Sequence, residues 1–170
     1  MKRFVILSVV LLCFALSCKD NKAEANPDQN GDADAVSTNL DNALLLKLVN
    51  QVRASGCNCG TMAMPPVPAL SWSNVIAKAA YHHSSDMNKN NFFTHVSSDG
   101  KTLSDRFDAV GYPWKAIAEN IAKGQKDEQT VMNSWLSSEG HCKNIMSANY
   151  KEMGTARVGS YWTQDFGARR

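Results

Sequence analysis

The sequence predicts one folded domain of the α+β class behind an export segment and a tether. Helical periodicity of apolar residues dominates the chain up to about residue 137, whereas a looser alternation of apolar and polar residues follows only near the end. Helices that precede strands in this way are typical of α+β folds. The 170-residue chain is 44% hydrophobic and 20% charged, which suits a single globular core.

Residues 1–17 have the form of a secretory signal. Lys2 and Arg3 precede an apolar run that ends at Leu16, and this run is shorter than the roughly 20 residues that span a bilayer. Residues 15–18, Ala-Leu-Ser-Cys, resemble the lipobox of bacterial lipoproteins. We therefore expect cleavage before Cys18, lipidation of Cys18, and an exported lipoprotein whose partner is the membrane, at the outer membrane or cell surface. An ordinary signal peptide that is cut nearby is the alternative.

Residues 18–38 are predicted to form a flexible tether. They are rich in Asn, Asp, Ala and Lys and nearly free of large apolar side chains, so they cannot bury enough surface to fold. The folded domain is therefore predicted over residues 39–170. Lys2 and Arg3 account for the whole net charge of +2, because the rest of the chain holds equal numbers of acids and bases. This neutrality argues against a nucleic-acid partner.

The first element of the domain is a predicted helix over residues 39–55, which Gly56 ends. Apolar residues recur there at every fourth position, and Leu45 and Val49 widen the stripe. The main stripe consists of Leu40, Leu44, Leu48 and Val52. The next stretch contains three prolines at positions 65, 66 and 68, so it must be extended or turning.

A second helix is predicted from Ser73 to about Asn90. Its apolar face contains His83, which we interpret as a packed, hydrogen-bonded core residue, whereas His82 lies on the polar face. A short helix should follow, because Thr102 and Asp105 resemble a helix start and Gly111 a helix end.

No regular element is assigned to residues 112–126. A fourth helix is predicted over residues 127–137, and one more turn of helix over residues 142–146. Residues 153–166 alternate loosely between apolar and polar types, which predicts two strands joined near Gly159 and Ser160.

Three cysteines remain once the signal is removed and Cys18 is lipidated. A bridge from Cys142 to either Cys57 or Cys59 is expected in an exported protein and would leave one thiol free. A zinc site of three thiolates and one histidine is the alternative, although the sequence lacks the CxxC spacing of zinc knuckles.

Several residues are candidates for a functional site. His95 follows two phenylalanines, Glu119 stands among apolar neighbours, and His141 follows Gly140. The chain contains no GxSxG elbow, HExxH motif or phosphate-binding glycine loop. Residue spacing alone therefore leaves the function open.

Seven short stretches resemble, in order, the cysteine-rich secretory, antigen 5 and pathogenesis-related (CAP or SCP-like) proteins in their bacterial form. They are Asn50–Arg53, Phe92–His95, Asp105–Arg106 with Gly111–Tyr112, Glu119–Ala122, Trp135–His141, Asn144–Met146 and Tyr161–Gln164. The resemblance implies an α-β-α sandwich around a central antiparallel sheet. It also implies a cleft that is lined by His95, Glu119 and His141.

The chain departs from the animal and plant pattern of this family at two positions. Tyr161 stands where those members have a histidine, and Ser138 stands where they have a glutamate. Tyr161 is therefore expected to offer a hydroxyl to the cleft in place of an imidazole.

The resemblance and the residue types together suggest a membrane-anchored binding protein that is not an enzyme. Two imidazoles and a carboxylate, from His95, His141 and Glu119, suit zinc or another divalent ion. A lipid-like ligand or an envelope partner is a further expectation for the same cleft. The alternative is a metal-assisted hydrolase or peptidase of the cell envelope with Glu119 as its base. The same three side chains also suit a buried hydrogen-bond network without a ligand.

Overall fold

The computed structural model describes residues 36–170. The predicted signal segment, Cys18 and nearly all of the predicted tether lie outside the described residues. Within the described part of the chain, no helix has the length and apolar character that crossing a membrane would need.

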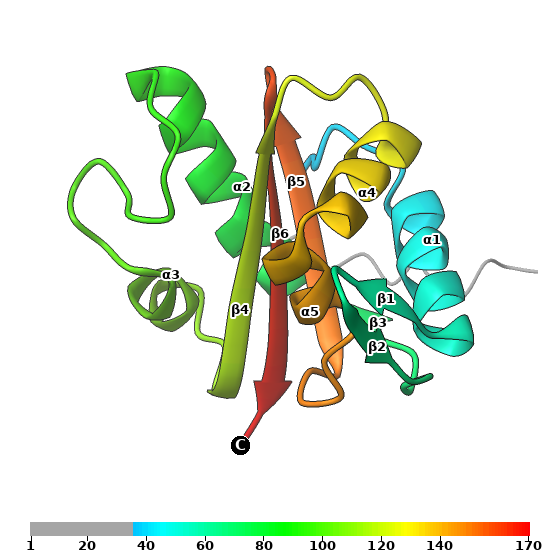
Figure 1. Ribbon diagram of the computed structural model, residues 1–170. Helices are drawn as coiled ribbons and strands as arrows, with labels where there is room; N and C mark the ends of the chain where they lie inside the picture. The colour runs from blue at the N-terminus through cyan, green and yellow to red at the C-terminus, as the bar shows by residue number, and fades with distance from the viewer. Residues whose placement is uncertain (1–35) are drawn as a thin grey trace, which may run out of the picture. The chain divides into compact units, whose positions relative to one another are not determined.

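A four-stranded sheet lies between two groups of helices (Figure 1). Its order is β3 (Ser71–Trp72), β5 (Glu152–Val158), β6 (Tyr161–Arg169) and β4 (Trp114–Lys123). The three long strands are antiparallel, and only the two-residue β3 pairs in parallel. The predicted α-β-α sandwich with a central antiparallel sheet is therefore confirmed, with β3 as the parallel exception.

The two faces of the sheet are covered by different helices. Helices α2 (Asn74–Asn90) and α3 (Leu103–Ala109) cover one face, and α1 (Asn42–Ser55), α4 (Glu128–Ser137) and α5 (Glu139–Ile145) cover the other (Figure 1). Because side chains alternate along a strand, neighbouring residues of β4 point into different layers. This alternation places candidate site residues on both faces of β4.

Helix α1 begins three residues later than predicted. The side chain of Asp41 accepts a hydrogen bond from the Leu44 amide and caps the helix. The buried row is Leu45, Val49 and Arg53, one position beyond the predicted main stripe. The buried Arg53 guanidinium ends this row and donates hydrogen bonds to the backbone carbonyls of Pro68, Ile145 and Ser147.

The extended segment after Gly56 contains a hairpin that was not predicted. Strands β1 (Cys57–Cys59) and β2 (Met62–Met64) pair through a turn at Gly60. The following prolines lie in irregular backbone, as their fixed φ and missing N–H require. The hairpin packs against α5, which positions the cysteines discussed below.

Helices α2 and α3 match their predictions because their end signals are local. Ser73 caps α2, and Asn91 ends it in the left-handed conformation. Thr102 and Asp105 form a reciprocal capping box at the start of α3. His83 is fully buried and His82 is exposed, as the helical pattern predicted.

Strand β4 is the main correction to the sequence-based prediction, which left residues 112–126 unassigned. Its centre carries Glu119 and Asn120, and both are buried. Polar residues on both faces hide the alternation that normally identifies a strand. The strand becomes evident only through its pairing with β6 over its whole length.

The remaining elements agree with the sequence except at their ends. Helix α4 begins one residue after its predicted start, with Asp127 as its cap, and α5 begins at Glu139 rather than at Cys142. Strands β5 and β6 are joined at residues 159 and 160, and β6 continues to Arg169.

Candidate functional site

Glu119 lies at the centre of the candidate site, in the middle of β4 on the face covered by α2 and α3. Its side chain is only 2% exposed. A carboxylate that is buried to this extent is stable only when charged or hydrogen-bonded partners replace water. The surrounding elements supply two such partners, His95 and Arg106, and place a second buried acid beside them.

His95 is the first partner and comes from the loop between α2 and α3. Its Nδ1 donates a hydrogen bond of 2.7 Å to Glu119 Oε1, and the side chain remains 57% exposed. The hydrogen bond to Glu119 raises the pKa of His95. In the neutral ring, donation from Nδ1 leaves the Nε2 lone pair as an acceptor.

Arg106 of α3 is the second partner, and it also holds the His95 loop. Its Nη2 donates to Glu119 Oε2 at 2.6 Å, and its Nη1 donates to the backbone carbonyl of His95 and to Ser97 Oγ, both at 3.1 Å. The guanidinium is buried. One buried cation therefore neutralises Glu119 and fixes the backbone from which His95 projects.

Asp165 of β6 is a buried acid that lies directly opposite Glu119 in the strand register. It is fully buried, and neither of its carboxyl oxygens accepts a hydrogen bond from the described residues. Burial, followed by the negative charge of Glu119, raises the pKa of Asp165 well above its usual value. Burial and the neighbouring charge therefore favour the neutral, protonated form of Asp165.

His83 of α2 is a buried histidine that lies next to Glu119. Its Nε2 donates to the Thr94 carbonyl at 2.9 Å and lies 3.9 Å from Glu119 Oε2. Burial lowers the pKa of His83, so the ring is neutral at pH 7. The packed, hydrogen-bonded role predicted for this histidine agrees with these contacts.

His141 of α5 lies on the other side of β4, and Asn120 fixes its backbone. Asn120 Nδ2 donates to the carbonyl of His141 at 3.2 Å, and Asn144 Nδ2 donates to Asn120 Oδ1 at 2.9 Å. Glu119 and Asn120 thus point to opposite faces of the sheet, where one holds the His95 loop and the other holds α5. The adjacent pair sets the position of both histidine-bearing segments relative to β4.

The His141 side chain is half-buried and lines a hollow of about 280 Å³ together with Phe93 and Ser138. Burial lowers the pKa of His141, and the positive charge of His95 lowers it further. The two imidazoles therefore lie close enough to interact electrostatically, although no direct contact joins them in the described part of the chain.

Tyr161 lies beside this region but turns its hydroxyl elsewhere. Its Oη donates to Asn91 Oδ1 at 3.1 Å, and its ring is buried. Lys123 Nζ lies 4.4 Å from the ring centroid, and the ring of Phe93 lies 6.4 Å away. The phenol thus ties β6 to the end of α2.

The predicted ligand set of His95, Glu119 and His141 does not gather into one tight cluster. Among the described residues, the group of three or more His, Cys, Asp or Glu side chains whose ligand atoms all lie within 4.8 Å consists of Cys57, Cys59 and Cys142. Glu119 has one oxygen engaged by His95 and the other by Arg106. In this arrangement Glu119 orients the His95 ring through the hydrogen bond to Nδ1. The Nε2 atom of His95 and the imidazole of His141 remain available to a ligand.

The cysteines divide into one bridge and one thiol. Cys59 and Cys142 form the disulfide, and Cys57 is free. Of the two expected partners for Cys142, Cys59 is therefore the bonded one.

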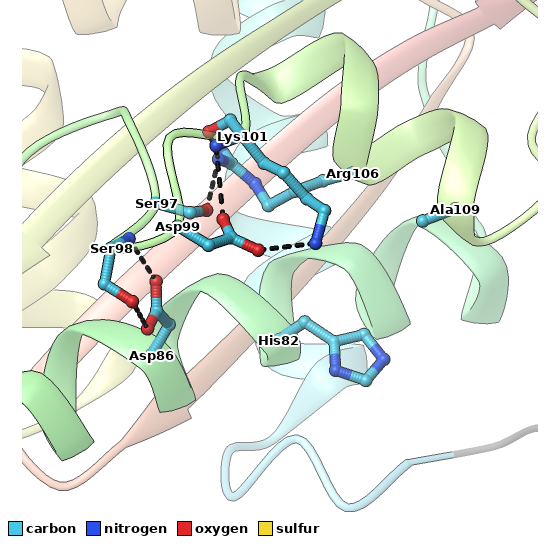
Figure 2. A pocket seen from close by; sticks show the side chains of 8 residues that line it. All are labelled: His82, Asp86, Ser97, Ser98, Asp99, Lys101, Arg106 and Ala109. Atoms are coloured by element: carbon cyan, nitrogen blue, oxygen red, sulfur yellow. Dashed lines mark hydrogen bonds and ion pairs between the residues drawn. The ribbon is translucent and has the colours of Figure 1, made fainter.

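A second hollow, of about 330 Å³, lies on the outer side of the His95 loop between α2 and α3 (Figure 2). Its charged groups are paired with one another or with the loop. Asp86 accepts hydrogen bonds from the amide and hydroxyl of Ser98, and Lys101 pairs with Asp99. These contacts hold the loop in place. We therefore interpret the residues around this hollow as structural residues that position the loop carrying His95.

Arg106 and Asp165 are the site residues that sequence reasoning missed. Arg106 stands in one of the stretches that carry the family resemblance, but nothing local assigns it to Glu119. Asp165 is identified only through the β4–β6 register. The one signal that could have drawn attention to it is that Asp165 is the single charged residue in the segment 161–168.

The sequence and fold of the chain are similar to those of known proteins. The profile of the family described as "CAP: Cysteine-rich secretory protein family" matches residues 46–166. The uncharacterized protein YkwD of Bacillus subtilis (strain 168) is 39% identical over 99 residues, which cover 57% of this chain and 38% of that protein.

Two solved structures share the fold. An extracellular protein from Bacillus anthracis that contains an SCP domain matches with a TM-score of 0.67 and 30% identity, over 76% of this chain and 40% of that one. An outer surface protein from Borrelia burgdorferi matches with a TM-score of 0.65 and 19% identity, over 75% of this chain and 92% of that one. The matched region is thus about two fifths of the length of the two Bacillus proteins.

Proposed function

The chain belongs to the cysteine-rich secretory protein (CAP) family, and we propose that it is an exported, membrane-anchored protein that binds a divalent metal ion through His95 and His141. The observation that carries the proposal is the hydrogen bond from His95 Nδ1 to the buried Glu119 carboxylate. A histidine that binds a metal through one ring nitrogen commonly donates its other N–H to a carboxylate, which fixes the tautomer and orients the ring.

The chemistry of both imidazoles suits such an ion. Burial keeps the pKa of His141 low, so this ring is neutral and able to ligate at pH 7. The pKa of His95 is raised, so a proton competes with the metal at lower pH. Zinc affinity should therefore rise with pH until His95 is deprotonated. Water would complete the coordination shell of an open site.

Glu119 acts in this proposal as a positioning residue. Arg106 holds the Glu119 carboxylate in place, and the hydrogen bond between Glu119 and His95 orients the imidazole. Replacement of such a partner typically lowers metal affinity by about 10- to 100-fold. We expect a loss of that size for Glu119→Gln and a larger loss for a variant without both imidazoles.

Zinc titration by calorimetry tests this proposal on the full chain after its free thiols have been alkylated. The double variant His95→Ala, His141→Ala should lose the binding isotherm. His82→Ala is the matched control, because His82 is an exposed histidine on the outer side of α2, and it should bind zinc as the wild type does. Equal zinc binding by the wild type and the double variant would refute the site.

The hydrolase alternative is less well supported, because a general base must reach a water molecule. The Glu119 side chain is 2% exposed and its two oxygens are engaged. If Glu119→Gln abolished the cleavage of a peptide or ester substrate by the wild type, the hydrolase would become the better assignment.

Export and anchoring are the second part of the proposal. They are supported by the lipobox-like residues 15–18 and by the similarity to an extracellular protein of Bacillus anthracis. Several acyl chains on Cys18 would give stable membrane attachment. Cys18→Ala should abolish the incorporation of labelled fatty acid and release the protein into the soluble fraction. Continued labelling of this variant would exclude Cys18 as the lipidated residue.

A further inference from the structure

Three sulfur atoms gather where the β1–β2 hairpin meets α5. Cys57 and Cys59 are two residues apart on β1, so their side chains point to the same side of the strand. That side faces Cys142 of α5, which is bonded to Cys59. All three sulfurs lie within 4.8 Å of one another, and Cys57 Sγ is 3.7 Å from Cys142 Sγ.

The bridge and the thiol differ in their access to solvent. Cys59 and Cys142 are both 0% exposed, so a thiol in solution cannot attack either sulfur of the bridge in the folded protein. Cys57 is partly exposed and free. It therefore touches both the solvent and the buried disulfide.

We propose that these three cysteines form a thiol–disulfide exchange site in which Cys57 is the nucleophile that connects the buried bridge to small thiols and disulfides in solution. The Cys57 thiolate attacks Cys142 Sγ, so that a bond forms between residues 57 and 142. The bond between residues 59 and 142 breaks, and its electron pair leaves on Cys59, which takes up a proton. One disulfide replaces another, and nothing is oxidised or reduced overall.

The exchanged bridge then has a partly exposed sulfur at Cys57. A thiolate in solution attacks Cys57 Sγ, forms a mixed disulfide with it and releases Cys142 as a thiolate that is protonated. A second thiolate attacks the outer sulfur of the mixed disulfide and frees Cys57. Two external thiols are thus oxidised to one disulfide while the protein bridge is reduced to two thiols, and the reverse sequence installs the bridge from an external disulfide.

The ionisation of Cys57 sets the rate of the internal step. Burial raises the pKa of the Cys57 thiol, so the thiolate is a minor species at neutral pH and its population grows as pH rises. The reduction of the buried bridge should accelerate with pH accordingly, because only the thiolate attacks.

The first experiment measures how fast reduced glutathione opens the Cys59–Cys142 bridge in the folded full chain. The reaction is quenched by alkylation, and the two cysteines are quantified in their own peptides, so that Cys13 and Cys18 do not enter the readout. We expect Cys57→Ser to slow the opening at least tenfold while its urea-unfolding midpoint stays that of the wild type. Asn58→Ala, in the same strand, is the matched control and should open at the wild-type rate. Equal rates for the wild type and Cys57→Ser would overturn the proposal.

The second experiment traps the exchanged state. In Cys59→Ser the Cys142 sulfur has lost its native partner, and we expect fragment-ion mass spectrometry to find a bridge between residues 57 and 142. A folded Cys59→Ser protein in which both of these cysteines stay reduced in air would also overturn the proposal. The kinetic comparison with Cys57→Ser decides the question if Cys59→Ser does not fold.

Discussion

Glu119 shows how one buried carboxylate can order a loop at the protein surface. The removal of a carboxylate from water costs several kcal/mol unless partners replace the lost hydration. Arg106 supplies the opposite charge and a hydrogen bond, and His95 supplies a ring N–H. Since Arg106 also binds the His95 backbone, the same contacts that stabilise the charge restrict the imidazole to one orientation.

The Asp165 carboxyl group should make the free energy of unfolding depend on pH. Its pKa is raised in the folded protein, whereas it ionises near pH 4 in the unfolded chain. Above pH 4 the folded state therefore holds one more proton, and the free energy of unfolding falls by up to about 1.4 kcal/mol per pH unit until the folded-state pKa is reached. Asp165→Asn keeps the size of the side chain but does not titrate. We expect this variant to gain stability relative to the wild type as pH rises from 5 to 8.

Urea unfolding at several pH values measures this difference directly. Burial also lowers the pKa of His83, so the fold loses stability as pH drops below the pKa of this histidine in the unfolded chain. This effect is the same in the wild type and in Asp165→Asn, so it cancels in the difference between their free energies of unfolding. A stability difference between the two proteins that does not vary with pH would show that Asp165 is ionised in the fold.

At the scale of elements, the predicted parts are those with local signals. Helices α2, α3 and α4 each begin at a side chain that caps the helix, and the β5–β6 hairpin turns at Gly159. Strand β4 has no such signal, because Glu119 and Asn120 place polar groups on both of its faces. The pairing of His95 with Glu119, and the roles of Arg106 and Asp165, depend on that strand and its register, so their geometry could not be derived from the sequence alone.

The packing of α2 on the sheet depends on the missing side chain at Gly154 of β5. A Cβ atom at this position would lie 2.1 Å from the backbone nitrogen of Ala77 and 2.6 Å from its Cα. Backbone atoms of a helix cannot move aside singly, so the whole helix would have to shift. Gly154→Ala should lower the free energy of unfolding by about 1–3 kcal/mol or more, as overpacked cores do, and this is measured by urea unfolding.

Gly140 of α5 provides the matched control for this substitution. A Cβ atom there meets nothing within 4 Å, and alanine is favoured over glycine within a helix by about 1 kcal/mol. Gly140→Ala should therefore be neutral or stabilising. If Gly154→Ala were equally well tolerated, the contact between β5 and α2 would not limit the packing.

At the scale of the whole molecule, the fold is closed by contacts between segments far apart in the chain. The site alone joins the α2–α3 loop, α3, β4 and β6, and the disulfide joins residues 83 positions apart. The expectation of a bridge to Cys142 needed only the cysteine count and the export signal. The choice of Cys59 over Cys57 depended on the hairpin, which was not predicted.

The bridge should contribute mainly by restricting the unfolded chain. The loop-entropy relation gives about 4–5 kcal/mol for a closed loop of this length. Cys142→Ala removes the shared partner of both other cysteines, so neither of them can restore the long-range bridge to α5. We expect its free energy of unfolding to fall by up to that amount, while circular dichroism of the folded state is unchanged. Cys57→Ser keeps the bridge and should unfold close to the wild type, and the wild type reduced under denaturing conditions and refolded should match Cys142→Ala. Equal stability of Cys142→Ala and Cys57→Ser would mean that the disulfide does not restrict the unfolded ensemble.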